Sequence, residues 1–295
     1  MSMKKETPSD VRLHLAAVNG DLKVIRRLLD SGKVHVDCRD KDGTTPLILS
    51  SANGHLECVQ ELLEQGADPA ARRVTGTTAL FFAAQAGYMD VAQLLITHHA
   101  PVDTPSVDGG TALFVACQYG HYDMVQLLAR HNANINACMK DGASPLFIAA
   151  QNGHADTCRL LLTLGASIDQ RRLDGATPLW IAAQMNHGAV VRLLLKHGAF
   201  VDAVRHDGAT PLFKACHKGH VDVVQDLLKY NPSLGKLPNG ESALHAAALF
   251  GHLGIVKLLL HGGANLRLKN QDGRTPFDLA ASGRHCHVLE YLKMH

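Results

Sequence analysis

The sequence predicts an all-α solenoid of about nine stacked helix–turn–helix repeats. The main observation is a hydroxyl residue, usually followed by Pro or Ala and then Leu, which recurs every 33 residues with one step of 32. It stands at Thr45, Thr78, Thr111, Ser144, Thr177, Thr210, Ser242 and Thr275. A second observation is that most intervals hold a turn signal and two short apolar segments at helical spacing. Because each repeat of a solenoid contacts only its neighbours, we expect function on an extended surface.

The period outweighs the estimate of two domains that a length of 295 residues would suggest, and it predicts a single repeat domain over residues 1–295. Hydrophobic residues make up 46% of the chain and aromatic residues only 5%, a mixture that lets small helices pack closely. The predicted repeats are approximately 8–41, 42–74, 75–107, 108–140, 141–173, 174–206, 207–238, 239–271 and 272–295.

Residues 174–206 illustrate the elements of one repeat, which opens on an Asp-Gly turn signal. Thr177 is predicted to cap a short first helix, because its hydroxyl can accept a bond from an unpaired backbone N–H. Pro178 falls at the first helical position, where a missing N–H is tolerated. Residues 190–195 form a wide apolar stripe that predicts the second helix, and Gly198 is predicted to end it.

Histidine recurs directly after the first helix, at His55, His121, His154, His187, His220 and His252. Neighbouring repeats would space these side chains by about 10 Å, whereas zinc ligands lie about 2 Å from the metal. We therefore interpret them as turn residues that bond to backbone. The run His285-Cys286-His287 is too close-set for a metal site, and no metal or cofactor is predicted.

The charge and the apolar runs narrow the class of protein further. The net charge of +2 is too small to indicate nucleic acid or an anionic membrane as a partner. No apolar run reaches the roughly 18 residues of a spanning helix, and the seven cysteines are scattered without metal-ligand spacing. The sequence thus predicts a soluble intracellular protein without distinguishing cytoplasm from nucleus, and no membrane insertion.

Two recurring segments resemble the ankyrin repeat family over roughly residues 10–295. DGTTPL, DGASPL, DGATPL and DGRTPF are similar to its D-G-x-T-P-L opening, and LLEQGAD, LLKHGAF and LLHGGAN to its L-L-x-x-G-A-D segment. The resemblance implies antiparallel helix pairs, β-hairpin fingers on one side, and a concave face built from fingers and first helices. It also implies protein binding through that face and no catalysis.

The chain departs from the family pattern in the slot that usually holds His after T-P-L. This slot is occupied by Ile48, Phe81, Phe114, Phe147, Trp180 and Phe213, with only His245 regular. Five consecutive repeats thus carry an aromatic side chain at this one position. The pattern predicts either a buried hydrophobic ladder with rings stacked along the solenoid, or exposed rings that line a ligand groove. A second departure is the residue missing between Thr210 and Ser242, which predicts a distorted finger around Asn231 to Asn239.

Partner-binding candidates follow from the resemblance, which implies that hairpin tips and outer positions of first helices meet the ligand. The tip candidates are Val74, Val107, Lys140, Leu173 and His206. The helix candidates are Gln85, Gln118, Tyr119, Gln151, Asn152, Gln184, Met185, His217, Lys218 and Phe250. Tyr119, Met185 and Phe250 are of the types that anchor interfaces, or else are singly exposed residues of no consequence. The recurring Gln is alternatively a framework hydrogen bond between neighbours.

The predicted function is a non-catalytic protein–protein interaction scaffold or adaptor with an unidentified protein partner. No Ser-His-Asp constellation or phosphate loop indicates an enzyme or a small-molecule substrate. The alternative is a structural spring or assembly element without a discrete ligand. Asn136, with Leu128 eight residues earlier, matches the spacing at which some family members are hydroxylated, the other interpretation being an ordinary turn Asn.

Overall fold

The computed structural model describes residues 6–238 and 240–295, and its regular secondary structure there is entirely helical. Eighteen helices and no strand lie in these residues, which confirms the predicted all-α class. The chain divides into two compact units, residues 1–140 and residues 141–295. The prediction of one domain and its repeat boundaries stays a prediction.

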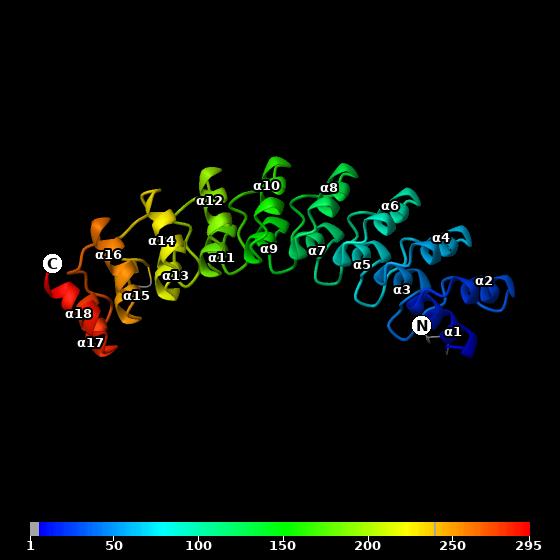
Figure 1. Ribbon diagram of the computed structural model, residues 1–295, viewed down its shortest axis with the longest axis horizontal. Coiled ribbons are helices and arrows are strands. Elements are labelled where there is room, and N and C mark those ends of the chain that lie inside the picture. Colours follow the sequence, from blue (N-terminus) through cyan, green and yellow to red (C-terminus); the bar gives the residue numbers. More distant parts are fainter. Residues whose placement is uncertain (1–5, 239) are drawn as a thin grey trace. The chain divides into compact units, whose positions relative to one another are not determined.

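Unit 1 consists of four helix pairs, which Figure 1 shows in chain order from blue to green. Its helices are α1 Pro8–Asn19, α2 Leu22–Asp30, α3 Pro46–Ala52, α4 Leu56–Glu64, α5 Ala79–Ala86, α6 Met89–Thr97, α7 Ala112–Tyr119 and α8 Tyr122–Arg130. The odd-numbered first helices pack on one another in sequence, and each also packs on its own second helix.

Unit 2 consists of five further pairs with the same arrangement (Figure 1). Its helices are α9 Pro145–Gln151, α10 Ala155–Thr163, α11 Pro178–Gln184, α12 Gly188–Lys196, α13 Pro211–Lys218, α14 Val221–Leu228, α15 Ala243–Leu249, α16 Leu253–His261, α17 Pro276–Ser282 and α18 Cys286–Lys293. Within it, α11 contacts α9, α12 and α13, so each internal first helix is held from three sides.

The hydroxyl anchors begin the first helices, as predicted. The Thr177 hydroxyl accepts the backbone N–H of Trp180 at 3.2 Å, and Pro178 occupies the first turn. The same bond runs from Phe81 to Thr78 and from Phe147 to Ser144. Because the cap satisfies a donor that the helix itself leaves unpaired, the start of each first helix is encoded locally.

Small side chains let the first helices approach closely, and the apolar stripes of the second helices close the core. Ala182 and Ala183 of α11 are fully buried, as are Val191 and Leu194 of α12. Burying the large side chains of the second helices removes apolar surface from water, which is the main favourable term in such a stack.

The recurring histidines His55, His121, His187, His220 and His252 bond to backbone, as does His285, which confirms their interpretation as turn residues. Nε2 of His187 lies 2.9 Å from the carbonyl oxygen of Gln151, at the end of the preceding first helix. Equivalent contacts of 2.8–3.4 Å join His55 to Val18, His121 to Gln85, His220 to Gln184, His252 to His217 and His285 to Leu249. Each imidazole therefore ties one repeat to the one before it.

A left-handed glycine makes room for five of these six rings. Gly153 has φ +78°, and a Cβ added there would lie 2.6 Å from Nδ1 of His187. The glycine is required both by its backbone conformation and by the imidazole that covers it. At Asn186 (φ +62°) a short polar side chain takes the same conformation, as the sequence predicts.

A second link between neighbouring repeats runs through aspartate. The Asp169 carboxylate accepts the backbone N–H of Phe200 with both oxygens, each at 3.2 Å. The same arrangement joins Asp37 to Asp68, Asp103 to Asn134 and Asp202 to Ser233. The sequence analysis did not assign a role to these carboxylates.

The predicted β-hairpin fingers are not confirmed, because the described residues contain no strand. Each connection is a tight turn instead. In the turn of residues 205–209, the Arg205 N–H donates to the Ala209 carbonyl at 3.1 Å and the Gly208 N–H donates to the Arg205 carbonyl at 2.9 Å. Two bonds close the turn but are too few to form a ladder of paired strand residues.

The repeat that is one residue shorter differs from the others between Ser233 and Leu237. Ser233 bonds to Asp202 as Phe200 bonds to Asp169, so the register holds to that point. Leu237 donates to the Glu241 carbonyl at 2.7 Å, as Arg205 does to Ala209, so the turn itself is regular. The residue is therefore lost within 234–236, inside the segment predicted to be distorted. Asn239 lies outside the described residues.

Truncation of the core tests the facing of the second helices. We expect Leu194→Ala, at a fully buried position, to lower the free energy of unfolding by about 2–5 kcal/mol, because it leaves a cavity. Lys196→Ala, at an exposed position of the same helix, should cost less than about 0.5 kcal/mol. Urea unfolding followed by circular dichroism measures both, and equal losses would contradict the assigned facing.

Alanine at two glycines separates backbone strain from the space that the histidine ring requires. Gly165 has φ +87° with no atom within 4 Å of an added Cβ, so Gly165→Ala should cost about 1–2 kcal/mol from conformation alone. Gly153→Ala should cost about 1–3 kcal/mol more, because its Cβ meets His187. A double-mutant cycle with His187→Ala checks the cause: the excess should vanish once the ring is removed. An excess that persists would mean that the ring is not its source.

Candidate functional site

The outer positions of the first helices form rows at the seventh and eighth residues after the six anchors from Thr78 to Ser242. In unit 1 they are Gln85 and Ala86, then Gln118 and Tyr119. In unit 2 they are Gln151 and Asn152, Gln184 and Met185, His217 and Lys218, and Leu249 and Phe250. All of these side chains are exposed or half-buried.

Three large apolar side chains stand at the eighth position. Tyr119 in unit 1 is 50% exposed, and Met185 and Phe250 in unit 2 are 46% and 44% exposed. Their Cα atoms are held by the helix ends, while about half of each side chain remains in contact with water. They are of the types enriched in protein interfaces.

The histidine links explain why the seventh position tolerates different side chains. The atom that receives the imidazole is the backbone carbonyl of the seventh residue, as at Gln85, Gln151 and Gln184. These links between neighbouring repeats use the backbone carbonyl of the Gln residue, and at Gln85 the side-chain amide also donates to the Tyr119 hydroxyl of the next repeat at 3.5 Å. His217 and Leu249 serve equally well as acceptors, which leaves the side chain at this position free to vary.

The predicted tip residues lie in a regular row of turns within each unit. The N–H of each tip residue donates to a carbonyl of the preceding turn, and we refer to this as the tip-to-tip bond. It runs from Val74 to Asp42, Val107 to Thr75, Lys140 to Asp108, Leu173 to Asp141 and His206 to Asp174, at 2.7–2.9 Å. Because these bonds use only backbone atoms, all five side chains remain exposed.

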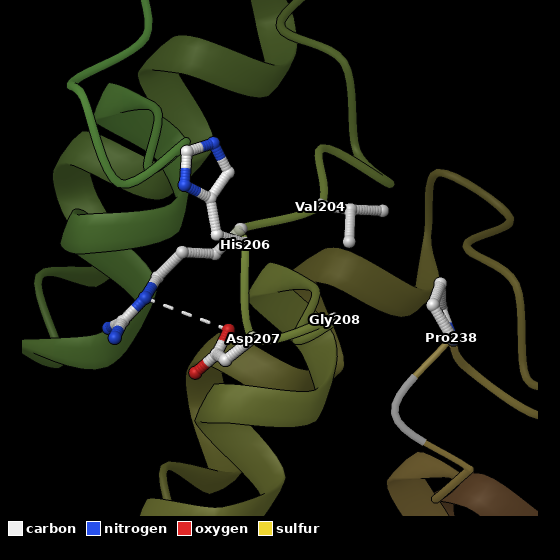
Figure 2. Close-up of a pocket in the computed structure, with 6 residues that line it drawn as sticks. Val204, His206, Asp207, Gly208 and Pro238 are labelled. Atoms are coloured by element: carbon white, nitrogen blue, oxygen red, sulfur yellow. Dashed lines mark ion pairs between the residues drawn. The ribbon is translucent and has the colours of Figure 1, made fainter.

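Pro238 interrupts the row in unit 2. It stands four residues before its anchor, at the tip position, and proline has no N–H with which to make a tip-to-tip bond. A surface hollow of about 320 Å³ lies between Pro238 and residues 204–208, as Figure 2 shows. The Arg205 side chain lines this hollow and pairs with the Asp207 carboxylate at 3.6 Å.

Three of the five aromatic side chains in the slot after T-P-L are buried. Phe114 and Phe147 are buried and Trp180 is only 1% exposed, while Phe81 and Phe213 are half-buried. The Trp180 indole N–H donates to the Ala209 carbonyl at 3.0 Å. The buried interpretation is therefore correct for the three buried rings, which do not line a groove.

The predicted stacking of these rings on one another is wrong. Within either unit, the described residues show no ring pair between successive members of the slot. Cations lie over the rings instead: Arg172 is 5.6 Å from the centre of Phe147, and Arg205 is 4.8 Å and Lys214 5.6 Å from that of Trp180. A guanidinium or ammonium group is attracted by the face of an aromatic ring, and the long side chains fill the space between repeats.

Lys214 and Leu249, which were not predicted from the sequence, complete a cluster of basic, aromatic and apolar side chains in unit 2. We define the basic–aromatic face as Met185 at the end of α11, Lys214, His217 and Lys218 of α13, Leu249 of α15 and Phe250 at the end of α15. The His217 and Phe250 rings meet edge to face with centres 4.4 Å apart. Lys214 escaped notice because this position holds Ile148 or Ile181 in other repeats.

The electrostatics of the basic–aromatic face are governed by desolvation. Partial burial lowers the pKa of His217, with further lowering by the neighbouring Lys214 and Lys218. The imidazole is therefore neutral at pH 7, and the positive charge resides on the lysines. Partial burial also lowers the pKa of Lys214, in part offset by Asp207.

The structure offers no arrangement typical of a metal centre in the residues it describes. All seven cysteines are free thiols, and burial raises the pKa of the Cys158 thiol to about 12. None of the helices described is long and apolar enough to cross a membrane. Asn136 is exposed after α8, where its N–H bonds to the Asn134 side chain; its modification stays a prediction.

Comparisons with known proteins agree with this architecture. The family model described as "Ankyrin repeats (3 copies)" matches residues 13–106, 98–172, 146–237 and 230–295, and so covers nearly the whole chain. Such repeats are generally protein–protein interaction modules, and no catalytic family is indicated.

Several curated relatives match over short stretches. Ankyrin repeat domain-containing protein 29 from Danio rerio is 53% identical over 68 residues, which is 23% of either chain, and its Homo sapiens counterpart is 52% identical over the same share. Ankyrin repeat domain-containing protein 49 from Homo sapiens is 47% identical over 66 residues, 22% of this chain and 28% of that protein. This chain therefore spans about a quarter of the length of the relatives it matches. With the family matched along nearly all of its length, the chain belongs to the ankyrin repeat family.

Proposed function

We propose that the chain is a non-catalytic scaffold that binds a partner protein through the outer rows of its first helices and the adjoining turn tips. The observation that carries the proposal is the exposure of Tyr119, Met185 and Phe250 at one equivalent position of three repeats. An interface is usually dominated by a few large apolar or aromatic anchors surrounded by contacts of lesser energy.

The rigid backbone beneath these side chains supports the proposal. The histidine links and the tip-to-tip bonds occupy the polar backbone atoms of the face without using its side chains. A partner would therefore meet side chains whose backbone is already ordered, which reduces the entropy lost on binding. The exposed tip residues Val74, Val107 and Leu173 extend the apolar surface beside the first helices.

The candidate residues have different supporting arguments. Lys140, His206 and Lys218 would contribute charge or hydrogen bonds at the rim, where polar groups set specificity. The half-buried Gln151 and Gln184 would donate side-chain amide hydrogens to a bound backbone, because their links to the next repeat use their carbonyl groups. Gln85 would support the anchor Tyr119, to whose hydroxyl its side chain donates at 3.5 Å. Gln118 and Asn152 occupy the same rows.

Capture from a cell lysate on the immobilised full chain tests the proposal. The triple variant Tyr119→Ala, Met185→Ala and Phe250→Ala should retain specific partners at least about tenfold more weakly, because removing one anchor typically costs about 2 kcal/mol or more. Quantitative mass spectrometry measures the retained proteins, and thermal unfolding verifies that the variant is folded.

A matched control uses apolar residues of similar exposure on a different surface. Leu56, Tyr122 and Val221 are 36%, 41% and 43% exposed, and each is the first residue of a second helix. Their triple alanine variant should retain the partners of the unaltered chain. Equal retention by all three proteins would contradict binding through the proposed face, whereas a chain that captures nothing specifically would favour a structural spring or assembly element.

A further inference from the structure

We propose that the basic–aromatic face of unit 2 binds an acidic segment of a partner protein, with carboxylates on Lys214 and Lys218 and an apolar side chain against Phe250. This inference rests on the proposed scaffold function and specifies the chemistry of the partner at one surface. It follows from three observations: unpaired ammonium groups, a local lack of acidic residues, and exposed apolar side chains beside them.

The first observation concerns the two lysines. Lys214 and Lys218 are separated by one helical turn of α13 and so project on the same face. In the part of the chain that the structure describes, neither ammonium group has a carboxylate within 4.0 Å, whereas that of Lys229 pairs with Asp226 at 2.7 Å. Their charges are therefore available to a partner.

The second observation is the distribution of acidic residues. The segments 178–185, 211–218 and 243–250, which make up three successive first helices and their ends, contain no Asp or Glu. In the turns before the first two of these helices, the Asp174 and Asp207 carboxylates are paired with Arg205 at 3.7 and 3.6 Å, and Asp207 also acts on the charge of Lys214. The field over the face is thus positive even though the chain as a whole carries a net charge of only +2.

The third observation is the apolar surroundings of the charge. Lys214 lies over the Trp180 ring at 5.6 Å, and partial burial already disfavours its charged form. A partner carboxylate would replace water around this ammonium group, and the low-polarity surroundings would strengthen the attraction. Phe250, packed edge to face on His217, offers an aromatic surface for an apolar residue of the same segment.

Unit 1 lacks this combination. At the positions equivalent to Lys214, His217 and Lys218, its third and fourth first helices hold Phe82, Gln85 and Ala86, then Val115, Gln118 and Tyr119, none of which carries a charge. The proposal therefore assigns the acidic part of a partner to unit 2 specifically, and unit 1 serves as an internal comparison.

Selection from a library of short random peptides displayed on phage, with the full chain as bait, tests this inference. The selected peptides should be enriched in Asp and Glu relative to the library and should contain an apolar residue. Synthetic versions are then measured by fluorescence anisotropy, together with versions in which Asn and Gln replace Asp and Glu.

Charge reversal maps the site. The double variant Lys214→Glu and Lys218→Glu should weaken binding at least about tenfold, as should the amide versions of the peptides. Affinity for the unaltered chain should fall several-fold between about 0.05 M and about 0.5 M NaCl, because salt screens the attraction. The matched control Arg159→Glu and Lys196→Glu makes the same charge change on exposed positions of second helices and should alter affinity less than about twofold. Thermal unfolding checks that both variants are folded.

The outcomes separate this inference from the function on which it rests. Peptides that bind both double variants equally, or that are neutral or basic, would overturn the acidic assignment. If such peptides still lose binding with Tyr119→Ala or with Met185→Ala and Phe250→Ala, the scaffold function stands. A library with no peptide sensitive to any of these changes would count against both. Anionic phospholipid vesicles and single-stranded DNA are tested in parallel, and binding of either through Lys214 and Lys218 without acidic peptides would also overturn the proposal.

Discussion

The link from a histidine ring to the carbonyl at the end of the preceding first helix is the constraint on which each unit depends. Helix C-termini leave carbonyl groups without partners inside the helix. Here the next repeat supplies a donor, as His187 does for Gln151, and its ring lies over Gly153, which is in the left-handed conformation. Asn186 takes that conformation where His220 bonds to Gln184. One contact thus satisfies a polar group and joins two repeats.

Two further hydrogen bonds join neighbouring repeats. The Asp169 carboxylate accepts the backbone N–H of Phe200, and the tip-to-tip bond from the His206 N–H to the Asp174 carbonyl joins two turns. All three links end on backbone atoms of the neighbour. The residues that receive them are therefore free in side-chain identity, which is why a regular framework can carry Gln, His or Leu at one surface position. Variation of the exposed rows does not disturb the stacking, and this property suits a surface that recognises another macromolecule.

Irregularity is concentrated in the middle of unit 2. The shortened segment after Ser233, the proline at the tip position 238 and the lysine at 214 all fall within two successive repeats. Their consequences are a hollow beside Arg205 and a face where ammonium groups lie next to aromatic rings. The framework bonds on either side of these features are retained, since Leu237 still closes its turn and His252 still reaches His217. The local changes therefore alter the chemistry of the surface and leave the helix pairs intact.

The sequence by itself determined the helix pairs, their caps and their order, because these depend on contacts within a few residues. Thr177 and Pro178 begin a helix wherever they occur together before an apolar run, and the period of 33 residues requires the stacking. The histidines were likewise assigned correctly to backbone, since their spacing left no room for a shared metal. The outer rows were also placed on exposed surface from the sequence alone.

Only the tertiary structure decided what lies between neighbouring repeats, because those contacts join residues about 30 positions apart. The ring column expected from Phe147, Trp180 and Phe213 does not form, since the cations of Arg172, Arg205 and Lys214 occupy the faces of two of these rings. The predicted hairpin fingers are not confirmed, because the described turns are closed by two backbone hydrogen bonds without paired strands on either side. The basic–aromatic face could not be predicted from the sequence. Lys214 replaces the isoleucine of other repeats, but its role depends on the aromatic ring beneath it and on the absence of a paired carboxylate among the described residues, which only the structure shows.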